Sequence, residues 1–263
     1  MVPRALTIAG SDSSGGAGVQ ADLKTFTAMG VYGMSAVTAL TAQNTVGVQE
    51  VLVVPASFVR AQIEAVVTDL GPAPTKTGML ASREIVEVVA AAVTEHELKP
   101  LVVDPVMVAQ TGARLLEPDA VDALRRRLLP LATVVTPNVP EAEALLGYPI
   151  ESVDDMRRAA HAFVEMGAAS CLIKGGHLPS ERATDVFHDG RQCVVLDTPR
   201  LPTPHTHGTG CQLSAAIVAG LAKGMDTLAA IRLAKQFIKC AIEAALPTGK
   251  GCGPANPLAW PRS

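Results

Sequence analysis

The sequence predicts an α/β fold in which helices cover both faces of a mostly parallel sheet with an antiparallel edge. The main observation is that short runs rich in β-branched residues alternate with longer amphipathic segments along the chain. A second is the dipeptide Asp189-Gly190 between two such runs, which is typical of a β-hairpin and predicts the antiparallel edge. A third is that the 263 residues, 48% of them hydrophobic, contain no Gly/Ser/Pro-rich linker. We therefore expect residues 1–263 to form one domain, a three-layer α/β/α sandwich.

The individual elements follow from this periodicity. Strands are expected where β-branched and other apolar residues cluster between turn-forming residues, at 5–9, 34–40, 51–54, 75–79, 101–103, 133–135, 171–173, 185–188 and 193–196. Helices are expected where apolar residues recur every three or four positions, at 18–28, 57–69, 82–96, 119–128, 140–145, 153–166, 212–223 and 227–245. Ligands of open α/β sheets bind at the carboxyl ends of strands, so the residues that follow each strand are the candidates for a site.

Composition and charge exclude several classes of protein. The formal net charge is −3, and the basic run Arg125 to Arg127 lies in a helical pattern as a solvated face, which argues against a nucleic-acid partner. Aromatic residues make up only 3% of the chain, too few for base-stacking platforms or a membrane-interface belt. No run is long enough to span a bilayer, and the first residues do not resemble a signal peptide. We expect a cytoplasmic protein with no membrane partner.

The five cysteines do not form a recognisable framework. They are odd in number and lack a Cys-x-x-Cys spacing, which argues against disulfides and a structural zinc site. We expect most of them, Cys171, Cys193, Cys211, Cys240 and Cys252, to be buried thiols. Only Cys211 has a neighbourhood that predicts reactivity.

Residues 205–216 form the most informative segment. The glycines predict a turn that opens into a helix, with Leu213, Ile217 and Leu221 on one apolar face. Such a turn directs free backbone N–H groups and the positive end of the helix dipole at one point, which favours an anion. Cys211 lies on this turn, where we expect a thiolate to be favoured. The same residues are equally compatible with an ordinary glycine-containing helix cap beside a packed cysteine.

Two other glycine-containing segments do not match standard nucleotide motifs. Residues 10–18 follow the first strand but lack the Gly-x-Gly-x-x-Gly spacing, so we interpret them as a phosphate or small-ligand loop. Residues 248–251 lack the upstream Gly and the following Ser/Thr of a Walker loop. If the protein uses ATP, we expect it to do so without a P-loop.

Charged and amide side chains follow three other expected strands. Asp104 follows residues 101–103, and Asn138 and Glu141 follow residues 133–135. Such oxygen ligands suit Mg²⁺ that is shared with phosphate groups, although Asp-Pro and Asn-x-x-Glu are also common turn and helix-cap patterns. Lys174 ends the strand 171–173, where an amine is a natural phosphate counter-charge or simply an exposed strand terminus.

A small-molecule pocket is predicted near the same edge. Gln43 ends a strand and can both donate to and accept from a heterocycle, while Met79 and Val106 supply apolar walls. Asp22 lies early in the first expected helix, on a different side from its apolar residues. Its simplest predicted role is solvation.

Several separated motifs together resemble one family. They are residues 10–22 (GSDSSGGAGVQAD), 37–45 (VTALTAQNT), 76–80 (KTGML), 104–107 (DPVM), 136–141 (TPNxxE), 174–177 (KGGH) and 207–211 (HGTGC). In this order they resemble the hydroxymethylpyrimidine/phosphomethylpyrimidine kinases of thiamin biosynthesis, which belong to the ribokinase-like superfamily. The resemblance implies a ribokinase-like fold, a homodimer, and ATP-dependent phosphorylation of 4-amino-5-hydroxymethyl-2-methylpyrimidine to its monophosphate and then to its diphosphate.

The resemblance also implies roles for individual residues. Gln43 and Asp22 would face the polar groups of the pyrimidine, with Gly10, Met79 and Val106 around its ring. At the phosphate side, the implied residues are Asp104 and Glu141 for Mg²⁺, Asn138 and Lys174 for the ATP phosphates, and Gly208, Thr209, Gly210 and Cys211 for the anion hole. Cys211 occupies the place of a superfamily aspartate base and would accept the substrate's hydroxyl proton.

Three departures from the family pattern and three alternatives accompany this interpretation. Gln212 stands where a Thr is usual, Gln110 replaces a usual Lys, and Cys252 stands where the tail customarily has a His.

The nearest alternative is a pyridoxal kinase of the same fold. A cysteine hydrolase or transferase would use Cys211 with His205 or His207 as base, although neither histidine has an evident carboxylate partner in the sequence. The third alternative is a heterocycle-binding protein without catalytic activity.

Overall fold

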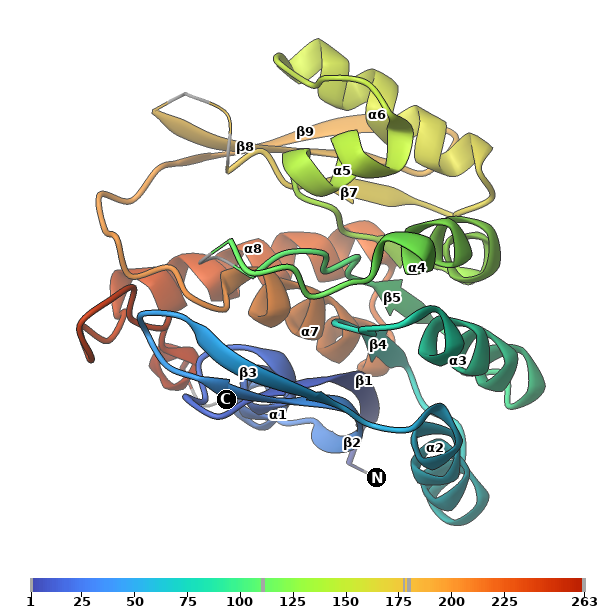
Figure 1. The fold of residues 1–263 in the computed structure, drawn as a ribbon. Helices are drawn as coiled ribbons and strands as arrows, with labels where there is room; N and C mark the ends of the chain where they lie inside the picture. Colours follow the sequence, from blue (N-terminus) through green and yellow to red (C-terminus); the bar gives the residue numbers. More distant parts are fainter. Residues whose placement is uncertain (1, 110–111, 177, 179–180, 262–263) are drawn as a thin grey trace.

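The computed structural model describes residues 2–109, 112–176, 178 and 181–261. Within this part of the chain nine strands form one sheet, in the order β3-β2-β1-β4-β5-β6-β7-β8-β9 (Figure 1). The strands are β1 (Arg4–Asp12), β2 (Tyr32–Gln43), β3 (Val48–Val53), β4 (Thr75–Thr77), β5 (Leu101–Val103), β6 (Val134–Val135), β7 (Cys171–Ile173), β8 (Arg182–His188) and β9 (Cys193–Pro199). All neighbours from β2 through β7 pair in parallel, which confirms the predicted mostly parallel sheet.

Helices cover both faces of the sheet. They are α1 (Gly18–Ala28), α2 (Ala56–Leu70), α3 (Arg83–Glu95), α4 (Pro118–Ala123), α5 (Val139–Leu146), α6 (Val153–Glu165), α7 (Thr209–Ala222) and α8 (Thr227–Glu243). One apolar core lies between the sheet and α2 to α6, and a second lies between the sheet and α1, α7 and α8. Figure 1 shows α3 and α4 on the opposite side of β4 and β5 from α7. The predicted three layers are therefore confirmed.

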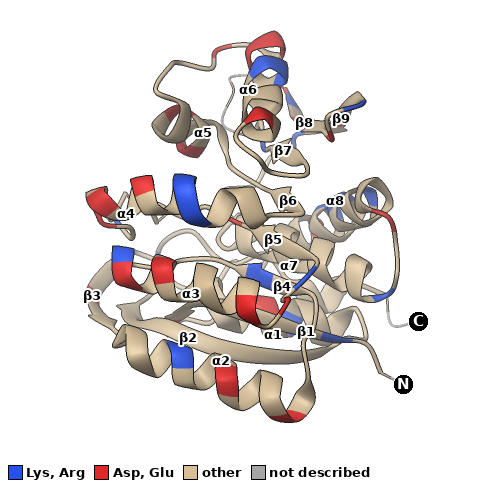
Figure 2. Ribbon diagram, turned by 90° about the vertical axis from the view of Figure 1, so that its right-hand side faces the viewer, with Lys and Arg blue, Asp and Glu red and all other residues tan. Residues whose placement is uncertain are grey.

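Side chains alternate between the two cores along the central strands. In β5, Leu101 and Val103 join the α2–α6 core, whereas Val102 joins the α1–α7–α8 core. This is the two-residue period of a strand that is buried on both faces. Charged residues are concentrated on the outward sides of α2, α3, α4 and α6 (Figure 2). No helix among the described residues is long and apolar enough to cross a membrane.

The sheet has antiparallel strands at both edges rather than one. The hairpin of β8 and β9 was expected, but β3 also pairs antiparallel with β2. The connection between β2 and β3 is only four residues long, too short for the crossover that a parallel pair requires. Sequence periodicity identified a strand in this region and not its direction.

Two helices differ from expectation. The single helix predicted at 119–128 is α4 followed by a π-helix at Leu124–Leu128 and a 3-10 turn at Leu129–Leu131, which contains Pro130. Helix α7 is buried almost all round and not only on the predicted face, because it lies under the sheet and is covered by α1 and α8. It also begins at Thr209 rather than Gln212, so Cys211 lies in its first turn.

Candidate active site

A cavity of about 840 Å³ lies at the carboxyl ends of the central strands. It is lined by most of the side chains that the sequence singled out: Gly10, Gln43, Met79, Asp104, Val106, Asn138, Glu141, Lys174, Gly208, Thr209, Gly210 and Cys211. Its volume lies within the range of ligand clefts. The parallel strands thus bring together residues that are up to 201 positions apart in the sequence, from Gly10 to Cys211.

The glycine turn before α7 presents backbone N–H groups to this cavity. Gly208 adopts a left-handed conformation with φ 78° and immediately precedes the helix. Thr209 N donates to Thr206 O and Gln212 N donates to Gly208 O, whereas the amides of Gly210 and Cys211 donate to no acceptor in the described part of the protein. Two free amides at a helix N-terminus form a seat for an anion. We call Gly208 to Cys211 the anion turn.

Cys211 is less acidic than its helix position predicted. Burial raises the pKa of the thiol to about 11, although the Lys76 ammonium and the Gly18 backbone act in the opposite direction. The expectation that a thiolate is favoured in the protein by itself is therefore wrong. Desolvation therefore outweighs the helix dipole, even though Cys211 is only partly buried and lines the cavity.

Asp22 is buried rather than solvated, which corrects the predicted role. It lies in α1, and both of its carboxylate oxygens accept hydrogen bonds from Lys76 Nζ, at 2.9 and 2.8 Å. Thr7 Oγ1 donates to the same carboxylate at 2.6 Å. Asp22 is absent from the residues that line the cavity, whereas Lys76 is among them. Lys76 therefore connects the Asp22 carboxylate to the wall of the cavity.

Lys76 borders the site, although no local sequence pattern predicted a role for it. Its side chain is completely buried in β4. Burial opposes the ammonium form, but Asp22, Cys211 and Asp104 together raise the pKa of Lys76, so it stays protonated. A lysine within a short strand of a parallel sheet was the available signal, because such strands are buried on both faces.

A second lysine stands between two carboxylates. Lys174 Nζ lies 2.9 Å from Asp104 Oδ1 and 3.9 Å from Glu141 Oε2. Although burial acts in the opposite direction, Lys174 and Lys76 lower the pKa of Asp104. Burial raises the pKa of Glu141 to about 7, with Lys174 opposing the rise and Asp104 adding to it. One ammonium therefore does not neutralise both carboxylates.

Asn138 and Glu141 also realise the helix-cap interpretation. Glu141 N donates to Asn138 Oδ1, and Asn138 N donates to Glu141 Oε2, both at 2.8 Å, in a capping box at the start of α5. Both residues line the cavity at the same time. The cap holds the Glu141 carboxylate toward Lys174, so a residue that caps a helix also borders the cavity.

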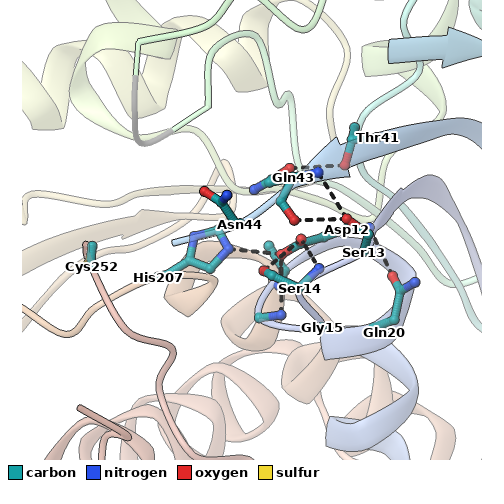
Figure 3. A network of polar contacts seen from close by, with 12 residues as sticks. Asp12, Ser13, Ser14, Gly15, Gln20, Thr41, Gln43, Asn44, His207 and Cys252 are labelled. Atoms are coloured by element: carbon teal, nitrogen blue, oxygen red, sulfur yellow. Dashed lines mark hydrogen bonds and ion pairs between the residues drawn. The ribbon is translucent and has the colours of Figure 1, made fainter. Parts of the chain in front are cut away.

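Gln43 is held at the end of β2 by the loop that follows β1. Ser13 Oγ donates to Gln43 O, and Gln43 N donates to Ser13 Oγ, each at 2.8 Å (Figure 3). Thr41 Oγ1 donates to the Gln43 side-chain oxygen at 3.1 Å. The main chain of Gln43 is thus held by Ser13, and its side-chain amide contacts Thr41 at the edge of the cavity.

His207 has a carboxylate partner that the sequence did not reveal. Its Nε2 lies 2.8 Å from Asp12 Oδ2, although the two residues are 195 positions apart (Figure 3). The statement that neither histidine has a carboxylate partner is therefore wrong for His207. The other histidine of the segment, His205, accepts a hydrogen bond from Gly253 N at its Nδ1.

Comparison with known proteins identifies the chain. The sequence model of the family described as phosphomethylpyrimidine kinase matches residues 12–256. The chain belongs to the phosphomethylpyrimidine kinase family. A hydroxymethylpyrimidine/phosphomethylpyrimidine kinase of Bacillus subtilis is 47% identical over 261 residues, which cover 99% of this chain and 96% of the relative.

Solved structures agree with this assignment. A phosphomethylpyrimidine kinase from Clostridium difficile has a TM-score of 0.80 at 44% identity, covering 90% of this chain and 97% of its own. A pyridoxal kinase from Bacillus subtilis, solved as an ADP complex, has a TM-score of 0.91 at 44% identity, covering 98% of both chains. The predicted ribokinase-like fold is confirmed, and this member of the family is a kinase.

Two of the three departures from the kinase family pattern, Gln212 and Cys252, lie where the C-terminal tail contacts the segment around the anion turn. Gln212 is buried, does not line the cavity, and donates from Nε2 to Ala255 O at 3.1 Å. The Cys252 thiol donates to Pro204 O at 2.7 Å and accepts from Thr206 N. Both residues attach the C-terminal tail to this kinase's turn. Gln110 lies outside the described residues, as does His177 of the KGGH motif.

All five cysteines of the kinase are free thiols, as predicted, but most of them are not fully buried. Only Cys171 is buried, Cys193 is exposed, and Cys211, Cys240 and Cys252 are partly buried. Scattered cysteines on helix surfaces and at strand ends reach the outside of the layers, which composition alone does not reveal.

Proposed function

We propose that this kinase transfers a phosphoryl group from ATP to 4-amino-5-hydroxymethyl-2-methylpyrimidine, and then a second one to the monophosphate. The observation that carries the proposal is that one cavity contains both apolar and amide side chains that suit a heterocycle and free backbone amides that suit an anion. Gln43, Met79 and Val106 supply the wall, and the anion turn with Lys174 supplies the phosphate end. Phosphoryl transfer mainly requires this kind of positioning and charge neutralisation.

We propose that the phosphates of ATP lie between Lys174, Asn138 and the anion turn. The cavity continues from Lys174 to side chains of β9 and α8, including Thr198 and Ile238, which leaves room for the rest of the nucleotide. The related pyridoxal kinase from Bacillus subtilis was solved with ADP, which supports a nucleotide in this fold.

Asp104 and Glu141 are the residues that we propose to hold Mg²⁺. They are hard oxygen ligands with only Lys174 between them, and the pKa of Glu141 is raised by burial and further by the nearby Asp104. In the described ranges, no group of three or more His, Cys, Asp or Glu side chains could hold a metal alone. Mg²⁺ would therefore share these carboxylates with phosphate and water, as it prefers. Bound there, it supplies positive charge against the phosphates.

Cys211 is proposed as the acceptor of the substrate's hydroxyl proton. As the hydroxyl oxygen bonds to the γ-phosphorus, the bond to the bridging oxygen breaks, ADP leaves with that electron pair, and the proton moves to sulfur. Sulfur must first be a thiolate, and Lys76 and the helix N-terminus favour that form. Because the thiol pKa is about 11, turnover should rise with pH above neutrality.

Two substitutions test this role. Cys211→Ala should lower turnover strongly and leave the pyrimidine dissociation constant within about tenfold, since the ring contacts lie elsewhere. Cys211→Asp supplies a group that is ionised at neutral pH and should flatten the dependence of turnover on pH. Unchanged turnover in Cys211→Ala would show that this sulfur is not the proton acceptor.

A homodimer formed by the single domain 1–263 is the proposed assembly. Its support is an apolar surface on β2, β3 and α2, where Leu40, Val51, Leu52, Val53 and Phe58 are 38–64% exposed. Light scattering should give twice the monomer mass, and Leu52→Lys should reduce it. An unchanged mass in this variant would place the interface on another surface.

The cytoplasm stays the compartment that the sequence predicts for this kinase.

The deciding experiment is a phosphorus NMR time course with ATP, Mg²⁺ and the hydroxymethylpyrimidine. Monophosphate followed by diphosphate is the expected result, and no product would contradict the proposal.

A second function, pyridoxal phosphorylation, is favoured by the TM-score of 0.91 with a pyridoxal kinase. Parallel assays with pyridoxal should give a lower kcat/KM than the pyrimidine does.

A further inference from the structure

Two loops from opposite ends of the chain meet beside the reacting centre. The first, residues 12–18, joins β1 to α1, and the second, residues 206–211, leads into α7. Figure 3 shows Asp12 of the first loop facing the ring of His207 from the second. The function proposed above does not use this contact.

Asp12 organises the first loop. Its Oδ1 accepts hydrogen bonds from Ser14 N and Ser14 Oγ, at 2.8 and 2.7 Å. Its Oδ2 accepts from Gly16 N at 3.2 Å and from Ala17 N at 2.8 Å. Burial opposes ionisation, but hydrogen bonds from His207, Ser14 and Ala17 lower the pKa of Asp12 to about 2. The loop is thus wrapped around a carboxylate that is ionised at neutral pH.

His207 joins the second loop to this carboxylate. Its Nε2 lies 2.8 Å from Asp12 Oδ2, and its side chain is only 12% exposed. The ring also packs against the backbone of the first loop, where a Cβ added to Gly16 would lie 2.4 Å from His207 Cδ2. The backbone of His207 is engaged separately, by Gly253 O and Ala255 N of the tail. Substituting the ring therefore leaves these tail contacts in place.

The residue after His207 makes the contact between the loops closer still. A Cβ added to Gly208 would lie 1.8 Å from Gly16 O, so the two backbones touch at this point. Gly18, at the end of the first loop, also acts on the Cys211 thiol. The anion turn therefore rests on the first loop at both of its ends.

We propose that His207 is a positioning residue whose hydrogen bond to Asp12 holds the anion turn against the loop of residues 12–18. The bond fixes where the amides of Gly210 and Cys211 and the Cys211 sulfur point. It should therefore matter for turnover more than for pyrimidine binding, because the wall of Gln43, Met79 and Val106 does not include His207. This inference rests on the proposed phosphoryl transfer.

Two substitutions separate the hydrogen bond from the bulk of the ring. His207→Phe keeps a ring against Gly16 but removes the donor, and a displacement of about 1 Å at a reacting centre can reduce rates about a hundredfold. We expect kcat of His207→Phe to fall about tenfold to a hundredfold, with the pyrimidine KM within about threefold. His207→Gln carries an N–H donor near the position of Nε2 and should recover most of the kcat.

The matched control is His161→Leu. His161 Nε2 lies 3.6 Å from Glu165 Oε1 in a histidine–carboxylate pair on the exposed side of α6, and His161 does not line the cavity. This variant should keep the kcat of the unmodified protein. A wild-type kcat in His207→Phe, or a kcat of His207→Gln no higher than that of His207→Phe, would overturn the proposal.

Hydrogen exchange tests the contact without using the reaction. In His207→Phe, amides of residues 14–18 and 206–211 should exchange faster, while those of β5 should not change. If the unmodified protein phosphorylated no pyrimidine, the proposed function would fail, and this measurement would still decide whether His207 holds the loops together. Unchanged exchange in both segments would overturn the inference. Should His207→Phe fail to fold, His207→Asn, whose amide is too short to reach Asp12, replaces it in the comparison with His207→Gln.

Discussion

The active site contains two lysine–carboxylate clusters, and they differ in their balance of charge. Lys76 pairs with Asp22 alone, and both side chains are completely buried. Lys174 faces two carboxylates, those of Asp104 and Glu141, and borders the open cavity. We call the first cluster the closed pair because its carboxylate, Asp22, does not line the cavity that Lys76 borders. The second cluster has one more negative than positive group.

This difference separates the closed pair from the cluster that we propose as the Mg²⁺ site. Asp22 accepts three hydrogen bonds from Lys76 and Thr7, so its carboxylate is well satisfied by the protein. Burial raises the pKa of Asp22, with Lys76 and Thr7 opposing the rise, and burial together with the nearby Asp104 raises the pKa of Glu141 to about 7. Residues of the same types thus perform different tasks according to their number and their access to the cavity.

The largest effect is expected when the closed pair is broken. Lys76→Met leaves the Asp22 carboxylate buried without its cation, and removing one partner of such a pair costs about 3–5 kcal/mol. We expect urea unfolding to report a loss of this order in the free energy of unfolding. Combining Lys76→Met with Asp22→Asn should restore part of the loss, since no unpaired charge is left. Equal stability of Lys76→Met and the unmodified protein would contradict the description of this cluster as a closed pair.

Breaking the open cluster should affect turnover more than stability. Lys174→Met removes a cation that faces the proposed phosphate position, and losing one such group typically lowers kcat about 10²–10³-fold. The loss in the free energy of unfolding should be smaller in Lys174→Met than in Lys76→Met, because Glu141 can take up a proton. Steady-state kinetics and urea unfolding measure the two effects. Lys223→Met, which removes an exposed lysine after α7, is the control and should change neither quantity.

The third prediction concerns the cation itself. Glu141→Gln keeps a side chain that can cap α5 but removes one proposed ligand charge, so the Mg²⁺ concentration for half-maximal rate should rise about tenfold or more. Glu143→Gln is the matched control, since Glu143 lies in the same helix and bonds Ile150 N instead of lining the cavity. The assignment of Mg²⁺ to this cluster would be wrong if both variants needed the same Mg²⁺ concentration.

The smallest expected effect is a dependence of stability on pH. The folded-state pKa of Glu141, about 7, lies above its ordinary value of 4.5. The folded protein therefore binds more protons than the unfolded chain between these values, and the contribution of Glu141 to stability is lost as the pH rises through about 7. Urea unfolding across this range without Mg²⁺ should show the loss in the unmodified protein and not in Glu141→Gln. Parallel curves for the two proteins would contradict the raised pKa.

The same contrast explains which site residues the sequence could predict. Asp104, Glu141 and Lys174 each follow a strand, and the carboxyl ends of parallel strands meet at one edge, so local patterns were sufficient to group them. Asp22 and Lys76 lie inside regular elements, where a helix position suggested solvation. Their pairing depends on how α1 packs against β1, the strand beside β4, and no local pattern encodes that contact.

The sequence by itself determined the alternation of strands and helices, the three layers, the family, and the residues at strand ends. These features depend on hydrophobic periodicity and on short motifs, which act over a few neighbouring residues. Only the tertiary structure decided the second antiparallel edge, the Lys76–Asp22 pair, the raised pKa of Cys211 and the bond between His207 and Asp12. Each of these depends on burial or on contacts between distant segments, because the strength of a charge or a hydrogen bond is set by what surrounds it in space.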